Sequence, residues 1–160
     1  MRYIGYLLLF ALIAFGIWPY YSVFRLDNAL GKPEVSALQD LVDLPAIQAN
    51  YKQRLAGGLD VLPKTADAGD VMGWLQQNLQ RLGDSALSQT ITLQWVRDTL
   101  QQAAGEATNQ KPPYLLAGVT FAFFESYDTF LVRIGELGHG ATHVRMKLEG
   151  QVWRVTDIIR

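Results

Sequence analysis

The sequence predicts an α+β protein with an N-terminal transmembrane helix. About five short helices should follow, packed on a C-terminal antiparallel sheet of three or four strands. Three observations lead to this prediction. An uncharged apolar run occupies residues 3–24, helical periodicity dominates residues 25–111, and the apolar period changes to two after Pro113. Helices and strands that are segregated along the chain are typical of the α+β class.

The composition favours one globular domain after the apolar run. The chain has 160 residues, 49% of them hydrophobic, and a formal net charge of −1. This balance is too apolar for intrinsic disorder and lacks the basic excess of most nucleic-acid-binding proteins. The sequence has no cysteine, which excludes a disulfide framework and a thiol nucleophile. We therefore expect a membrane anchor at residues 1–24, a single domain at residues 25–160 and no nucleic-acid partner.

Residues 3–24 are expected to cross a membrane as one helix. These 22 positions between Arg2 and Arg25 carry no charge. A helix of that length spans about 33 Å, enough for the hydrocarbon core of a bilayer. Aromatic side chains near both ends are typical of a spanning helix. They are Tyr3 and Tyr6 at one end and Trp18, Tyr20 and Tyr21 at the other.

A cleaved signal peptide is the alternative for this segment. Residues 7–14 would form its apolar region, and residues 14–16 have small side chains at the spacing that a cleavage site requires. Cleavage there would remove residues 1–16. The aromatic residues and the continued apolar character after residue 16 favour an uncleaved anchor.

The helical half of the domain, residues 25–111, is expected to contain about five helices. The first, at residues 22–30, has Ser22 as its cap, and the second covers residues 33–42. Asp43 is the expected N-cap of the third helix. Residues 60–70 predict a loop and residues 70–82 a fourth helix. The last helix runs to about Ala104. The apolar sides of the third and last helices are Ile47, Tyr51 and Leu55, and Leu93, Val96 and Leu100.

The sheet half, residues 114–160, shows alternating apolar residues. Strands are expected around residues 119–123, 130–134, 143–148 and 151–159, with a Gly-rich loop at residues 135–140. Glu149-Gly150 predicts a two-residue hairpin loop. This register pairs Met146 with Trp153 and places Asp157 on the same face as Trp153.

Five stretches carry a resemblance to a known family. They are residues 18–21 continuing into 25–30, residues 37–47, 91–100, 124–133 and 153–158. In this order they resemble a bacterial domain-of-unknown-function family, number 2939, whose members have an N-terminal hydrophobic segment. The likeness covers nearly the whole chain, with Leu93 where a proline is expected after Thr92. The family has no assigned activity, so the resemblance implies no catalytic residue.

A looser resemblance concerns architecture alone. Helices followed by a meander that ends in Trp-x-Val resemble nuclear transport factor 2-like and cystatin-like domains, some of which hold a ligand between helices and sheet. The candidate ligand-binding residues are then Phe121, Phe123, Trp153 and Asp157. The three aromatic residues are also explained by an ordinary core. Asp157 is either a desolvated base in a pocket, or exposed, or bonded to backbone or arginine.

No motif in the sequence predicts a catalytic set, a metal site or a cofactor. His139 and His143 are four residues apart, but in a Gly-rich loop and a strand their rings diverge. Glycine-rich nucleotide motifs and the Gly-x-Ser-x-Gly motif of hydrolases are absent. Arg133, Lys147 and other basic residues give the predicted sheet a basic character, with Arg145 opposite Arg154.

The sequence therefore predicts a non-enzymatic binding or interaction module at the bacterial cell envelope. Residues 3–24 would anchor it in the inner membrane with the domain in the periplasm, where it would meet a protein partner. One alternative is a small apolar-ligand pocket, with isomerase- or dehydratase-like chemistry at Asp157. Another is an accessory subunit of a membrane complex.

Overall fold

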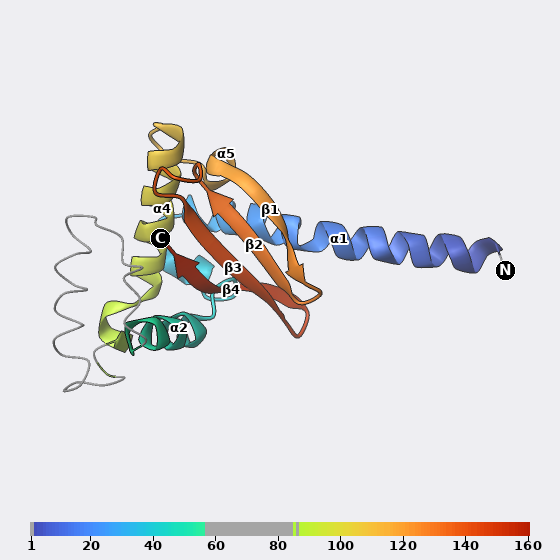
Figure 1. Cartoon of the computed structure of the whole chain (residues 1–160), viewed down its shortest axis with the longest axis horizontal. Helices are drawn as coiled ribbons and strands as arrows, with labels where there is room; N and C mark the ends of the chain where they lie inside the picture. The colour runs from blue at the N-terminus through green and yellow to red at the C-terminus, as the bar shows by residue number, and fades with distance from the viewer. Residues whose placement is uncertain (1, 57–84, 86) are drawn as a thin grey trace.

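The elements follow one another along the chain as the α+β class predicts. The structure, a computed structural model, describes residues 2–56, 85 and 87–160. The expected loop at residues 60–70 and the expected helix at residues 70–82 lie outside the described residues. The elements are α1 (Arg2–Leu30), η1 (Val35–Leu38), α2 (Leu44–Ala56), α4 (Leu93–Thr108), α5 (Leu115–Gly118), β1 (Val119–Ser126), β2 (Thr129–Ile134), β3 (Thr142–Glu149) and β4 (Val152–Ile159) (Figure 1).

Helix α1 is one uninterrupted helix with two different environments. Residues 3–14 are all exposed and project from the domain, whereas packing against the core begins at Phe15 (Figure 1). The side chain of Ser22 does not cap a new helix, because its hydroxyl donates to the carbonyl of Trp18 at 3.4 Å within the same helix. The core also begins before the expected boundary at residues 24/25, since Val23 is buried.

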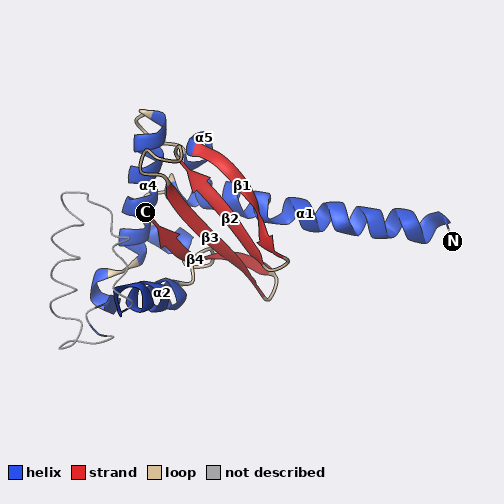
Figure 2. Cartoon of the chain, viewed as in Figure 1, coloured by secondary structure: helices blue, strands red, loops and turns tan. Residues whose placement is uncertain are grey.

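The sheet is an antiparallel meander in the order β1-β2-β3-β4 (Figure 2). Its inner face is apolar and packs against the C-terminal half of α1 and against α4. The buried residues of this face are Phe130, Val132, Ile134, Val144, Met146, Trp153, Val155 and Ile158. This inner face and the helices that cover it form the core of the domain.

The hairpin between β3 and β4 turns one residue later than the sequence predicts. Glu149 pairs with Val152, so Gly150 and Gln151 form the loop. Gly150 has a φ of 63°, which suits the first position of a tight hairpin turn. Met146 consequently pairs with Val155 and not with Trp153. Both strands keep their apolar faces, because a shift of two positions in pairing preserves the side-chain alternation.

A β-bulge at Thr156 moves Asp157 to the opposite face of the sheet from the one predicted. Met146 pairs with Val155, but the next pair along β3 is Arg145 with Asp157, which leaves Thr156 as the extra residue. One inserted residue reverses the alternation that follows it. Asp157 therefore shares the outer face with Arg145, and the prediction that it shares a face with Trp153 is wrong.

The same effect places Phe121 and Phe123 on the outer face. The pairing of β1 with β2 is irregular between Val119 and Phe121. After this irregularity Phe124, and not Phe123, pairs with the buried Phe130. Phe121 and Phe123 are therefore exposed, and the expectation that they face inward is wrong.

The edge of β4 is covered by the segment before α2. The amide of Val155 donates to the carbonyl of Leu41 at 2.8 Å, and the amide of Asp43 donates to the carbonyl of Val155 at 2.9 Å. This pairing explains why the expected helix at residues 33–42 is reduced to the short helix η1. Covering an edge also removes a site at which other chains could add a strand.

The expected start of α2 at Asp43 is confirmed in detail, and the structure also shows where α4 begins. The Asp43 carboxylate accepts from the amide of Ala46 at 3.1 Å, as an N-cap does. Thr92 caps α4, because its hydroxyl oxygen accepts from the amide of Trp95 at 3.2 Å. Helix α4 continues past Ala104 to Thr108, and the short helix α5 was not predicted.

Trp153 provides a test of this core. Its side chain is fully buried, and its ring meets those of Phe124 and Phe130 edge-on at 5.9 and 6.2 Å between centroids. We expect Trp153→Ala to lower the free energy of unfolding by about 3–5 kcal/mol. Leu137→Ala, at an exposed position, is the control and should change it by less than about 0.5 kcal/mol. Urea unfolding measures both, and equal effects would contradict the register.

Candidate functional site

The four residues predicted to bind a ligand lie in three separate environments. Trp153 is part of the inner core, Phe121 and Phe123 lie on the outer face of β1, and Asp157 is buried beneath α2 on the outer face of β4. The described residues therefore do not bring these four side chains together around one pocket. Within the described part of the chain, the environment of Asp157 and the exposed aromatic residues are two candidate sites.

Asp157 is held by an arginine from α2. One terminal nitrogen of Arg54, Nη1, donates to both carboxylate oxygens of Asp157, at 2.7 and 2.6 Å. The other nitrogen, Nη2, donates to the carbonyl of Ile158 at 3.2 Å. Arg145 approaches from β3, with its Nη1 at 3.6 Å from Asp157 Oδ2. Both oxygens of this buried carboxylate are therefore engaged with arginine, which is one of the outcomes that the sequence left open.

The charge on the outer face of the sheet is more balanced than the sequence predicts. Arg145 lies opposite Asp157 and not opposite Arg154. It also donates from Nε and Nη2 to the carboxylate of Glu125 on β1, at 2.7 and 3.2 Å. These hydrogen bonds lower the pKa of Glu125. A continuous series of ionic contacts thus runs from α2 through Asp157 and Arg145 to Glu125.

Tyr51 packs beside this series on α2. The guanidinium carbon of Arg54 lies 4.5 Å from the centre of the Tyr51 ring, a cation-π arrangement. The Tyr51 ring also meets Trp95 edge-on, with centroids 5.2 Å apart. Burial raises the pKa of Tyr51 to about 12, although the nearby Arg54 charge opposes this shift. These contacts orient Arg54 toward Asp157 and join α2 to β4, so the arrangement is a structural connection.

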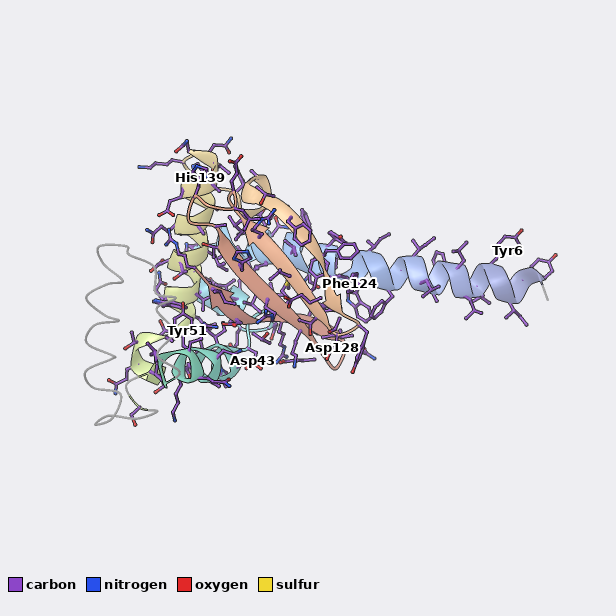
Figure 3. All side chains as sticks on the ribbon, viewed as in Figure 1. Tyr6, Asp43, Tyr51, Phe124, Asp128 and His139 are labelled. Carbon is purple, nitrogen blue, oxygen red and sulfur yellow. The ribbon has the colours of Figure 1, made fainter. Side chains whose placement is uncertain are left out.

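Exposed aromatic side chains gather where α1 leaves the domain. Phe121 and Phe123 on β1 and Tyr127 in the following turn are all exposed; we call these three residues the β1 aromatic surface. Phe124, which follows Phe123 in β1, points inward and lies beside α1 where that helix leaves the domain (Figure 3). Its ring stacks on Phe15 of α1, with centroids 5.9 Å apart. The β1 aromatic surface is therefore joined to the projecting helix through one pair of stacked rings.

A hollow of about 550 Å³ lies at the other end of α1, between that helix, α4 and the Pro112–Tyr114 segment. The polar side chains around it already hold these segments together. Asp27 accepts from the amide of Leu115 at 2.6 Å, and Gln101 donates to the carbonyl of Leu30 at 2.8 Å. None of the predicted ligand-binding residues lines this hollow.

The histidines are separated from one another in the structure. His139 is exposed in the loop after β2, and His143 lies on β3 opposite Arg133. Desolvation lowers the pKa of His143, and the charges of Arg133 and Arg145 add to this effect. Within the part of the chain that the structure describes, no three His, Asp or Glu side chains come together as metal ligands.

One family model matches the chain over residues 8–99, more than half of its length, and is described as a protein of unknown function, DUF2939. The chain belongs to the DUF2939 family. No curated protein and no solved structure matches it. The matched range of this DUF2939 protein begins within α1, covers η1 and α2 and ends within α4, so the four strands lie beyond it. The membership confirms the family resemblance and assigns no activity.

The Arg54–Asp157 pair of the DUF2939 protein can be tested by substitution. Among the described residues, Arg54→Met leaves the buried carboxylate with the more distant Arg145, at 3.6 Å, and we expect it to lower the free energy of unfolding by about 3 kcal/mol. Adding Asp157→Leu removes the unpaired charge and should restore most of that loss. The matched control is Arg154→Met, because Arg154 is half-exposed and 3.8 Å from Glu149. It should cost less than about 1 kcal/mol. A double variant no more stable than the single one would contradict this account.

Tyr51 gives a pH-dependent prediction. The phenol ionises near pH 10 in the unfolded chain, whereas in the folded protein its pKa is about 12. Between these values the folded state retains a proton that the unfolded state loses, so the free energy of unfolding should fall as the pH rises. Its slope should reach at most about 1.4 kcal/mol per pH unit. Tyr51→Phe keeps the ring but removes the ionisation. Urea unfolding from pH 9 to 12 should therefore show a shallower decline for the variant, and identical curves would contradict the burial of this phenol.

Proposed function

We propose that this DUF2939 protein is an N-terminally anchored, single-pass membrane protein whose α+β domain is a non-enzymatic interaction module. The observation that carries the proposal is the division of α1. The helix is long and apolar enough to cross a membrane. Its first part, residues 3–14, is an exposed apolar rod, while its second part belongs to the core. Exposing this apolar helix surface to water is unfavourable in free energy, whereas lipid surrounds it favourably.

The packing of α1 supports an uncleaved anchor over a cleaved signal peptide. Removal of residues 1–16 would take away Phe15 and its stacking on Phe124. It would also begin the mature chain inside a helix whose following turns, including Pro19 and Val23, are buried in the core. In the uncleaved chain the domain is joined to the anchor without a flexible linker.

The arrangement of charged side chains supports a non-enzymatic role. A general base must reach its substrate with a free oxygen. Both oxygens of Asp157 are bonded to Arg54, and Glu125 is bonded to Arg145. With the bacterial membership that the resemblance implies, the proposal places the anchor in the inner membrane and the domain in the periplasm. There it would bring a protein partner of the cell envelope to the membrane surface.

Fractionation of cells that express the full chain tests the anchor. We expect the protein to remain in membranes washed with alkaline carbonate, with an intact amino terminus. Leu12→Arg places a charge near the middle of the apolar run and should release part of the protein, because arginine there costs about 2.5–3.5 kcal/mol on insertion. Leu137→Arg, at a similarly exposed position in a domain loop, should not. A soluble product that begins at Ile17 would contradict the proposal.

A further inference from the structure

The length of the free part of α1 limits how the domain can lie relative to a bilayer. Residues 3–14 are exposed at every position and precede the first residue that packs on the core, and twelve helical residues span about 18 Å. The hydrocarbon core of a bilayer is about 30 Å thick. About 12 Å of the crossing must therefore come from turns of α1 that already pack against the sheet. A helix tilt would increase this shortfall, because a tilted helix crosses less depth per residue.

The strand that lies along those turns runs toward the membrane. The hydroxyl of Tyr20 donates to the carbonyl of Ala122 at 2.9 Å, and Phe15 stacks on Phe124. As β1 proceeds from Ala122 to Phe124, its contacts on α1 thus move from Tyr20 back to Phe15. Continuing in this direction leads to Tyr127 in the β1–β2 turn. Figure 1 shows this turn on the side of the domain from which α1 projects.

The exposed side chains at this end of β1 suit the boundary between lipid and water. Phe123 is 59% exposed and Tyr127 is 80% exposed. Phe123 lies level with the turns of α1 between Tyr20 and Phe15, which the contacts of Ala122 and Phe124 mark, and Tyr127 follows farther along the chain toward the projecting part of α1. Aromatic residues favour the headgroup level of a bilayer. The nearby charged groups are of both signs. Glu125 is paired with Arg145, and the guanidinium carbon of Arg133 lies 5.3 Å from the centre of the Phe121 ring. With both signs present, burial of apolar surface and not net charge would drive the contact. Trp18 and Tyr21 on α1 extend the exposed aromatic residues around the helix.

We propose that the β1 aromatic surface, Phe121, Phe123 and Tyr127, inserts into the interfacial layer of the bilayer that α1 crosses. This inference rests on the proposed membrane anchor. The domain would then be seated on the membrane in one fixed orientation, because α1 continues into the core as a single helix and β1 provides a second point of contact. The opposite end of the domain, with the loop that contains His139, faces away from the lipid (Figure 3).

The absence of cysteine makes the inference testable with single spin labels in the full chain. Phe123→Cys and Tyr127→Cys carry a nitroxide on the β1 aromatic surface. Leu12→Cys reports on the anchor, and Leu137→Cys, 66% exposed at the far end of the domain, is the matched control for Phe123. The labelled chains are reconstituted in vesicles of phosphatidylethanolamine and phosphatidylglycerol. Collision of each label with oxygen, which concentrates in lipid, and with a water-soluble nickel chelate is then measured by electron paramagnetic resonance.

We expect the labels at residues 123 and 127 to collide with nickel several-fold less often than the label at residue 137, while oxygen collisions stay high. The label at residue 12 should show the strongest preference for oxygen. If the label at residue 123 collides with nickel as often as a label in water does, while the label at residue 12 prefers oxygen, the proposed contact of β1 with the bilayer is wrong and the anchor stands. A water-like label at residue 12 would overturn the anchor itself. Protection of residues 123 and 127 from both reagents would mean that protein covers them, which also overturns the lipid contact.

Discussion

The packing of α1 against the inner face of the sheet is the constraint on which the rest of the structure depends. Val23 and Leu26 are buried between the sheet and the other helices, and burial of each such side chain contributes about 1.5–3 kcal/mol. Because the helix is continuous, this packing also fixes the direction in which the apolar residues 3–14 leave the domain (Figure 1). The core and the proposed anchor are therefore parts of one rigid element, and neither can be moved without the other.

The second constraint concerns the edge of the sheet that β4 forms, which would otherwise be an open edge. The Leu41–Asp43 segment pairs with Val155, and α2 then reaches the same strand through side chains. Asn50 donates to the carbonyl of Thr156 at 2.9 Å, which satisfies a backbone group at the bulge. Arg54 completes this edge by pairing with Asp157. A buried ion pair adds little net stability, but its geometry is specific, so its role here is to fix where α2 lies on β4.

The elements that local patterns define were predicted well from the sequence. The apolar run of α1, the Asp43 cap of α2, the periodicity of α4 and the alternation in β2 and β3 each depend on residues a few positions apart. The candidate site was predicted poorly, because it depended on which face of a strand each side chain occupies. Bulges in β1 and β4 reversed that alternation, and no residue in either strand signals a bulge as a glycine would. The alternation in the sequence consequently predicts that Phe123 and Asp157 face inward, whereas in the structure both lie on the outer face of the sheet.

The sequence by itself determined the fold class, the family, the order of most elements and the apolar character of residues 3–24. These properties follow from composition and short-range periodicity, which depend on residues close together in the sequence. Only the tertiary structure decided that α1 also packs in the core, that Asp157 forms an ion pair with Arg54, and that the aromatic end of β1 lies beside the projecting helix. Each of these outcomes joins residues about a hundred positions apart. Such contacts are selected by the packing of whole elements against one another, which no local pattern in the chain records.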